Sequence, residues 1–180
     1  MNGTSMINKT LVFAVLTSAL VSGCNSTTAT KETNVEVAEN ISKPKYEEFV
    51  TANSPLPISQ IVDIDGNKVE LTDGKNKKLV ILFATWCSDS NRALKALNNS
   101  DILKDPNIDV IAIAREETKE TVSKWRELNN IRVPLAVDPD RAIFKQFAAA
   151  GIPRMITVDN GKIIAMSLAE GENQLDKIVW

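Results

Sequence analysis

The stretch LVILFATWCSDSNRALKALNN, residues 79–99, joins a continuous apolar run to a segment with helical spacing. The run up to Ala84 is rich in aliphatic residues, which is typical of a strand that is covered on both faces. In the second half, Leu94 and Leu97 recur at helical spacing with polar residues between them. Cys87 falls where the strand ends and the helix begins. The stretch therefore predicts a thiol at the start of a helix in an α/β fold.

The segments on both sides of this stretch predict the remaining elements of an α/β domain. Asp65-Gly66-Asn67 and Asn160-Gly161 are signals for hairpin turns, and Asp138-Pro139 is a signal for a helix start. The elements are, in chain order, a hairpin over residues 58–71, a strand at 77–84, a helix at 90–98, a strand at 108–114, a helix with Val122, Trp125 and Leu128 on one face, a helix after Pro139 with Ile143, Phe144 and Phe147 turned inward, a hairpin over 153–168 and a last helix at 172–179. This order predicts an α/β sandwich with a mixed sheet.

The composition of the chain limits its chemistry. The chain has 180 residues, of which 43% are hydrophobic and 24% charged, and a net charge of -2 gives no reason to expect nucleic acid as a partner. It has no histidine, which excludes Ser-His-Asp and Cys-His catalysis and histidine-ligated metals within this chain. Its two cysteines, Cys24 and Cys87, imply no disulfide framework. We therefore expect neither a metal nor a cofactor.

The beginning of the chain has the pattern of an export signal. Lys9 precedes an apolar run, residues 11–21, that is too short to span a bilayer comfortably and fits the h-region of a signal peptide. The next residues, Val21-Ser22-Gly23-Cys24, resemble the lipobox of bacterial lipoproteins. The resemblance implies cleavage before Cys24 and attachment of diacylglycerol to its sulfur. The alternatives are an ordinary signal peptide and a buried hydrophobic segment with an incidental cysteine.

The residues that follow Cys24 predict a tether. Residues 25–45 are rich in Ser, Thr, Ala, Asn and Glu and hold too little apolar surface to order themselves. Asn25, by resemblance to enterobacterial sorting patterns, favours the outer membrane over the inner one. A lipidated Cys24 has no free thiol, so Cys87 becomes the one sulfhydryl of the mature protein. The chain is thus predicted to comprise a signal peptide at residues 1–23, a lipidated tether at 24–54 and a folded domain at 55–180.

Two long stretches of the domain resemble thioredoxin-like proteins of the TlpA/ResA type, within the redoxin superfamily. They are DIDGNKVELTDGKNKKLVILFATWCSDS (63–90) and NNIRVPLAVDPDRAIFKQFAAAGIPRMITVDNGKII (129–164), and the likeness covers residues 55–178. The resemblance implies a thioredoxin fold with an added N-terminal β-hairpin. It also implies a membrane-tethered, extracytoplasmic thiol-disulfide oxidoreductase. In this reading Cys87 is the nucleophile, Trp86 its flanking aromatic residue, and Pro153 a cis-proline that faces the sulfur.

The sequence departs from that family at the motif itself. Ser90 stands where the second, resolving cysteine is expected, so the motif reads Cys-Ser-Asp-Ser. The start of a helix favours thiolate over thiol, and Ser90 is a candidate hydrogen-bond donor to that thiolate. The negative charge of Asp89 acts in the opposite direction, and Arg92 and Arg154 are candidates to offset it.

A single sulfur restricts the reaction that is available. A thiolate attacks a disulfide to give a mixed disulfide, and without a neighbouring thiol an external thiol must release the partner. We therefore expect monothiol exchange with protein or small-molecule thiols and disulfides in the cell envelope. The alternative is a non-catalytic binding module with a relic cysteine. A thiol peroxidase is disfavoured, because the Pro-x-x-x-Thr-x-x-Cys pattern of peroxiredoxins would need other residues at Val80 and Ala84.

Overall fold

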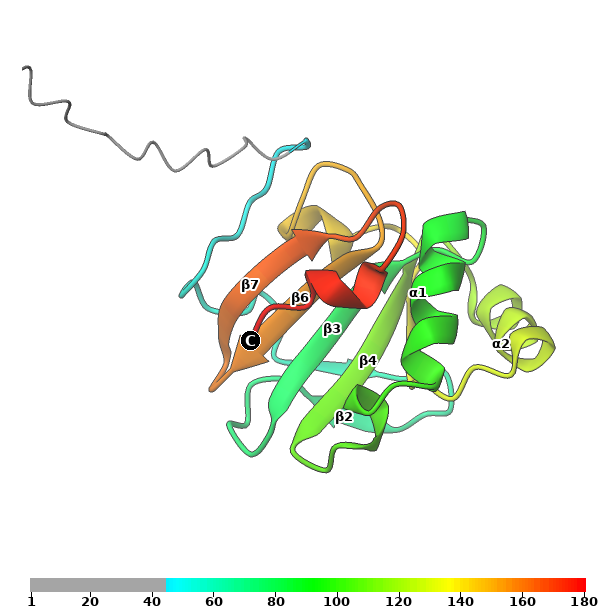
Figure 1. Cartoon of the computed structure of the whole chain (residues 1–180), viewed down its shortest axis with the longest axis horizontal. Coiled ribbons are helices and arrows are strands. Elements are labelled where there is room, and N and C mark those ends of the chain that lie inside the picture. Colours follow the sequence, from blue (N-terminus) through cyan, green and yellow to red (C-terminus); the bar gives the residue numbers. More distant parts are fainter. Residues whose placement is uncertain (1–44) are drawn as a thin grey trace, which may run out of the picture. The chain divides into compact units, whose positions relative to one another are not determined.

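A five-stranded mixed sheet organises the part of the chain that the computed structural model describes, residues 45–180. Its strand order is β5-β4-β3-β6-β7 (Figure 1). β3, β4 and β5 run parallel, whereas β6 and β7 are antiparallel to their neighbours. The strands are β3 (Lys77–Phe83), β4 (Ile108–Arg115), β5 (Leu135–Asp138), β6 (Arg154–Asp159) and β7 (Lys162–Leu168). The predicted α/β class and mixed sheet are confirmed.

The central strand β3 divides the core into two layers. Its side chains alternate, so that Val80 and Leu82 belong to one buried cluster, and Leu79, Ile81 and Phe83 belong to the other. Because both faces are covered, all of β3 after Lys77 is buried, as expected for a strand with a continuous apolar run.

Two helices cover the face of Leu79, Ile81 and Phe83. They are α1 (Ser88–Asn98), which contributes Leu94 and Leu97, and α2 (Lys119–Asn129), which contributes Val122. In Figure 1, α1 lies alongside β3 and β4, and α2 lies at the far side of α1. Leu128, predicted on the inner face, is 73% exposed. At 100° per residue, Leu128 lies about 120° around the helix from Val122. Two successive steps of three residues therefore place it off the buried face.

The hairpin expected over residues 58–71 is present as β1 (Gln60–Val62) and β2 (Lys68–Glu70), which pair antiparallel. One Oδ atom of Asp63 accepts the N–H groups of Asp65 and Asn67 at 2.9 and 2.7 Å. This pattern is a side-chain-supported turn. The hairpin is a separate two-stranded sheet, and Ile61 anchors it in the core.

The prediction of a helix directly after Pro139 is wrong. The structure has a 3-10 turn at Phe144–Gln146, and Arg141 before it adopts a left-handed φ of 61°. The carboxylate of Asp138 accepts the N–H groups of Ile143 and Phe144 at 3.0 and 2.8 Å. It therefore caps the turn from a distance rather than starting a helix at the next residue. The same Asp138 ends β5, a strand that the sequence analysis did not predict.

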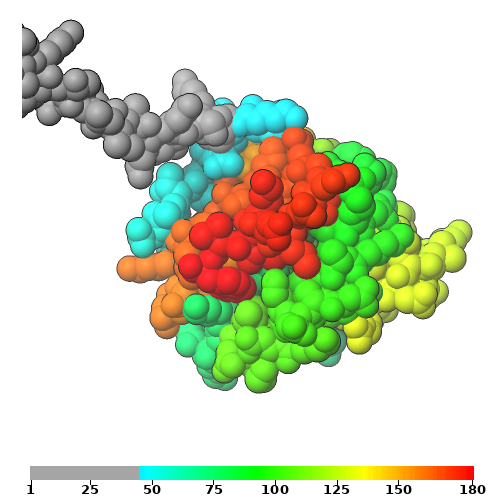
Figure 2. Space-filling view, viewed as in Figure 1, coloured from blue at the N-terminus to red at the C-terminus, as the bar shows by residue number. Residues whose placement is uncertain are grey.

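The last predicted helix, 172–179, is also a 3-10 turn, Gln174–Lys177. Figure 2 shows this C-terminal segment between β7 and α1 on one face of the molecule. Leu175 and Ile178 pack on the core cluster of that face, and Thr157 Oγ1 donates to the Val179 carbonyl at 2.5 Å. Tertiary contacts, rather than a helical hydrogen-bond ladder, hold the end of the chain.

The predicted tether extends too far. Residues 45–54 belong to the folded part, since Phe49 N–H donates to the Phe147 carbonyl at 2.9 Å and Asn53 N–H donates to the Ile163 carbonyl at 2.8 Å. Val50 is buried in the core. The pairing uses backbone groups, which composition does not reveal. The predicted signal peptide and Cys24 lie outside the described residues, and within 45–180 no helix is long and apolar enough to cross a membrane.

Candidate active site

Cys87 lies at the mouth of α1, as the sequence predicts. It is the N-cap residue, with extended backbone, and its carbonyl accepts the Asn91 N–H at 3.0 Å. The thiol is half-buried, and its sulfur lies 3.9 Å from the Ile152 carbonyl oxygen. The Ile152-Pro153 peptide bond is cis. A sulfur at the positive end of a helix thus stands beside a backbone turn that has lost one N–H donor.

Ser90 is fully buried in the first turn of α1. Its hydroxyl oxygen accepts the Ala84 N–H at 3.4 Å and so ties the helix to the end of β3. Within residues 45–180 no hydrogen bond joins this hydroxyl to the Cys87 sulfur, contrary to the role that the sequence analysis expected for Ser90. Ser90 supports the position of the loop rather than the charge of the thiolate.

Asn91 holds the loop between β3 and Cys87 from the helix side. Its Nδ2 donates to the carbonyls of Thr85 and Cys87 at 2.7 and 2.8 Å. Its Oδ1 accepts the indole N–H of Trp125 at 2.8 Å. One amide therefore links the cysteine backbone to both helices, and Trp125, expected only as a core residue, orients that amide.

Glu117 holds the same loop from β4. It is 8% exposed, and its carboxylate accepts the Thr85 N–H at 2.7 Å and also the Thr85 hydroxyl. Phe83 pairs with Ala114 across the parallel strands, so β3 and β4 end at the same edge of the sheet. The sequence analysis missed Glu117 and Asn91. The available signal was a polar run directly after a buried strand, because parallel strands place such residues together.

The cis-proline loop rests on the N-terminal segment. Gly151, at φ +87°, approaches Tyr46 so closely that an added Cβ would lie 2.6 Å from the ring. Arg154 is fully buried and donates to Glu48 at 2.5 Å and to the Ala150 carbonyl at 2.6 Å. Its charge is taken up by Glu48, which leaves it a structural role.

Asp89 and Arg92 form an ion pair within α1. Both also bind Gly171: Asp89 accepts its N–H at 3.2 Å, and Arg92 donates to its carbonyl at 3.1 Å. The two charges therefore compensate each other and tie α1 to the chain before the last turn. The structure does not bring Arg154 into this pair.

Trp86 presents its ring to solvent, with 63% of the residue exposed. The guanidinium of Arg115 lies over it at 5.7 Å and over the Phe144 ring at 4.8 Å. Burial, and then the positive charge of Arg141, lowers the pKa of Arg115, while Glu116 and Cys87 act in the opposite direction. The sequence analysis did not single out Arg115, which is the last residue of β4 and lies two positions before Glu117.

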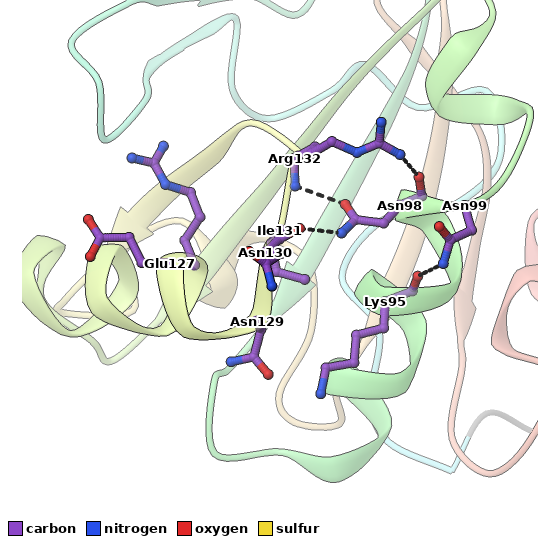
Figure 3. A pocket seen from close by; sticks show the side chains of 9 residues that line it. Lys95, Asn98, Asn99, Glu127, Asn129, Asn130, Ile131 and Arg132 are labelled. Atoms are coloured by element: carbon purple, nitrogen blue, oxygen red, sulfur yellow. Dashed lines mark hydrogen bonds between the residues drawn. The ribbon is translucent and has the colours of Figure 1, made fainter.

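A cavity of about 800 Å³ lies elsewhere, between the C-terminal ends of α1 and α2 (Figure 3). Its polar groups bind one another: Asn98 donates to the Asn130 carbonyl at 2.8 Å and accepts the Arg132 N–H at 2.9 Å. Asn99 donates to the Lys95 carbonyl at 3.3 Å. These bonds close helix ends, so we assign the cavity to the fold. In residues 45–180 no group of three His, Cys, Asp or Glu side chains is placed to hold a metal.

Several known proteins of similar sequence are named thiol-disulfide oxidoreductases, and one, of Mycobacterium tuberculosis, carries the name of a peroxiredoxin at 26% identity over 109 residues. ResA of Bacillus thuringiensis subsp. konkukian is 26% identical over 121 residues, which are 66% of this chain and 70% of that protein. ResA of Bacillus subtilis is 22% identical over 120 residues, 65% of this chain and 67% of that protein. These matches confirm the likeness to redoxins of the TlpA/ResA type.

Solved structures agree. A candidate protein disulfide isomerase of Bacteroides thetaiotaomicron superposes with a TM-score of 0.65 at 25% identity, over 73% of this chain and 87% of that chain. The thioredoxin domain of a Bacteroides vulgatus thiol-disulfide oxidoreductase superposes with a TM-score of 0.59 at 22% identity, over 71% of this chain and 94% of that chain. The thioredoxin fold is thereby confirmed. Residues 52–166 match the AhpC/TSA family, and the chain therefore belongs to that family.

Proposed function

We propose that this protein is a membrane-tethered, extracytoplasmic thiol-disulfide oxidoreductase that works through the single sulfur of Cys87. The observation that carries the proposal is the accessible Cys87 thiol, at the start of α1 and 3.9 Å from the carbonyl of the residue before a cis-proline. Ser90 occupies the place of a resolving cysteine, and Cys87 is the one cysteine among residues 45–180.

The reaction is a two-step exchange. The Cys87 thiolate attacks one sulfur of a disulfide, a new S–S bond forms, and the other half leaves as a thiolate that takes up a proton. An external thiolate then attacks the mixed disulfide, forms a disulfide with the bound half, and restores Cys87 as a thiolate. Each cycle exchanges thiol for disulfide between two partners, and the protein ends unchanged.

The surroundings of Cys87 suit this exchange. The positive end of the α1 dipole stabilises thiolate, and Asn91 and Glu117 fix the loop that aims the sulfur. Pro153 offers no N–H, so the adjacent backbone remains open to an extended peptide, with the exposed Trp86 ring at its side. Substrates in this proposal are protein or small-molecule thiols and disulfides of the envelope.

The anchor is part of the proposal. The Val21-Ser22-Gly23-Cys24 pattern supports a lipoprotein whose domain faces the periplasm, with the outer membrane favoured by Asn25. Expression of Cys24→Ala in a host with lipoprotein processing tests it. The proposal expects the wild type in the membrane fraction and the variant released, whereas a variant that stays bound would overturn the lipid anchor.

The activity is tested on the full chain with Cys24→Ala, in which Cys87 is the one thiol. We expect iodoacetamide to alkylate it at pH 7 several-fold faster than free cysteine, whose pKa is about 8.5. A rate equal to or below that of free cysteine overturns the redox proposal. The exposed Trp86 ring then favours the second candidate, a non-covalent binding module. That module predicts that partners captured by the wild type are also captured by Cys87→Ala.

A further inference from the structure

Arg115 is an arginine without a protein acceptor. Every other arginine within residues 45–180 donates a hydrogen bond to a protein oxygen. In the same range Arg115 donates none, although its Nε lies 3.2 Å from a Glu116 oxygen, and that Nε is buried. The side chain is 15% exposed. Buried polar groups are normally satisfied, so the buried Nε of Arg115 without a hydrogen bond needs an explanation.

Aromatic rings, rather than hydrogen-bond acceptors, hold this guanidinium in place. It lies 4.8 Å from the centre of the Phe144 ring and 5.7 Å from that of Trp86. Ring faces attract a cation without using its N–H groups in directed bonds. The planar fork of Arg115 is therefore positioned while its donors stay available for a ligand.

A second arginine adds positive charge at the same place. Arg141 lies over the Phe144 ring at 5.1 Å, and its Nε is also buried without a hydrogen bond. Glu116 contacts both, at 3.2 Å from Arg115 and 3.9 Å from Arg141. One carboxylate thus faces two guanidinium groups, and the cluster retains a net positive charge. Glu116 and Arg141 both stand in the left-handed region, at φ 60° and 61°, a strained setting that is enriched at functional sites.

The cluster adjoins the thiol. Trp86, under the Arg115 guanidinium, immediately precedes Cys87. Phe144 belongs to the core cluster on which Cys87 packs. Burial and Arg141 lower the pKa of Arg115 overall, and the charge of an ionised Cys87 acts against them. The open donors of Arg115 therefore lie in the neighbourhood of Trp86 and Cys87.

We propose that Arg115, with Arg141 beside it, is an anion-binding subsite of the Cys87 centre that receives a carboxylate of the thiol or disulfide undergoing exchange. The inference rests on the proposed function and narrows it to acidic substrates. Arg115 binds the carboxylate in a charge-assisted, two-pronged contact, and the sulfur of the same molecule meets Cys87. Attack then forms the Cys87 mixed disulfide, breaks the substrate S–S bond, and releases the other half as a thiolate.

Two chromogenic disulfides of different charge test the subsite. Dithiobis-nitrobenzoate carries carboxylates, whereas dithiodipyridine is neutral at pH 7, and both release a coloured thiol on attack. The full chain with Cys24→Ala is compared with the same chain carrying Arg115→Gln. The readout is the ratio of the anionic to the neutral rate constant. A change in the thiolate fraction scales both rates alike, so the ratio reports the affinity for negative charge alone.

We expect Arg115→Gln to lower this ratio about tenfold, the loss of a charge-assisted contact, and Arg141→Gln to lower it less. Raising the salt concentration should reduce the ratio of the wild type toward that of Arg115→Gln. Arg126→Gln is the matched control. Arg126 lies on α2 and pairs with Asp65 in the turn between β1 and β2, and its replacement changes the net charge of the chain by the same amount as Arg115→Gln. That control should keep the wild-type ratio.

The outcomes separate the two proposals. An unchanged ratio in Arg115→Gln, with a reactive neutral probe, overturns the subsite and leaves monothiol exchange intact. A fall of the same size in Arg126→Gln also overturns it, because net charge is then the cause. A wild type inert to both probes overturns the exchange proposal and the subsite with it. Should Arg115→Gln fail to fold, the salt dependence of the wild-type ratio decides: a salt-independent ratio rejects the subsite.

Discussion

The two ends of the β3–β4 strand pair differ in whether their buried positive charge is hydrogen-bonded to carboxylates. At the start, Lys78 is 2% exposed, and its ammonium lies 2.6 Å from Asp109 and 2.8 Å from Asp73. Lys78 and Asp109 are register partners, so the pairing is built into the sheet. At the other end, the guanidinium of Arg115 makes no hydrogen bond within the described chain, although a Glu116 oxygen lies 3.2 Å from its Nε, and it lies over the ring of Trp86, the neighbour of Cys87. The first end stabilises the fold, and the second leaves its charge available.

This contrast separates structural from functional charges. A buried cation destabilises the protein if it is unpaired, and Lys78 and Arg154 are both paired with carboxylates. Arg115 has only ring contacts and one carboxylate, that of Glu116, which is not aligned for a hydrogen bond. Of these three buried cations, Arg115 alone lacks a hydrogen-bonded carboxylate. Such a local exception to polar satisfaction is expected at a binding site.

The largest expected effect is that of Cys87→Ser in the chain with Cys24→Ala. It should abolish thiol release from both probe disulfides, because no other thiol of the chain remains to attack. The half-buried side chain changes little in volume, so urea unfolding should be nearly unaffected. Residual release of coloured thiol would show that the assay does not report Cys87.

Arg154→Met should cost about 3 kcal/mol of unfolding free energy, because it leaves Glu48 and the Ala150 carbonyl without their donor. Urea unfolding measures it. Arg115→Met, the same substitution at the arginine near Cys87, should cost under about 1 kcal/mol of unfolding free energy, because no hydrogen bond is lost. Equal costs for the two variants would contradict the assignment of Arg154 to the fold and Arg115 to the site.

Lys78→Met should cost about 2 kcal/mol at pH 7, less than a fully buried pair because Asp109 is 44% exposed. It should also change the pH dependence. Burial alone raises the pKa of Asp109, but hydrogen bonds from Lys78 and Asn76 lower it overall, and the hydrogen bond from Lys78 lowers the pKa of Asp73. Their stabilisation is therefore present above about pH 4 and lost as the pH falls through the lowered values.

At high pH, the change of stability with pH has the opposite sign. Burial lowers the pKa of Lys78, yet the two carboxylates raise it overall, so its contribution is complete below about pH 10 and is lost above that. Unfolding free energies at pH 7 and pH 3 test the pair. The difference between them should be smaller in Lys78→Met than in the wild type. An equal difference would show that this cluster does not supply the acid sensitivity.

Gly151→Ala should cost about 1 kcal/mol or more of unfolding free energy, because the residue stands at φ +87° against the Tyr46 ring. Gly171→Ala is the matched control, with φ +84° and open space around its Cβ position. Thermal unfolding of both separates the backbone cost from the clash. Equal losses would contradict the support that residues 45–54 give to the cis-proline loop.

The sequence predicted the elements whose signals are local. The buried strand that precedes Cys87 and the two glycine hairpin turns were anticipated from local signals, whereas the cis bond at Pro153 was anticipated from the family resemblance. The four-residue β5 was missed because Pro134 and a short run gave it no period of its own. The 3-10 turns at Phe144–Gln146 and Gln174–Lys177 were predicted as helices, because the spacing of apolar residues is similar in a 3-10 turn and in an α-helix.

The support of the site was beyond prediction for a different reason. Glu117 binds Thr85 and Trp125 binds Asn91 across separations of 32 and 34 residues, which no local pattern encodes. Arg154 was considered only as a candidate to offset the charge of Asp89. The partner that permits its burial, Glu48, lies 106 residues earlier, in a segment that was assigned to the tether.

Monothiol exchange is tested most directly by the stoichiometry of the reaction with dithiodipyridine, followed by intact mass, on the chain with Cys24→Ala. We predict one released thiol per chain, and an adduct of half the probe on Cys87 that persists until an external thiol is added. Absence of release, or an adduct that clears without added thiol, would contradict the account.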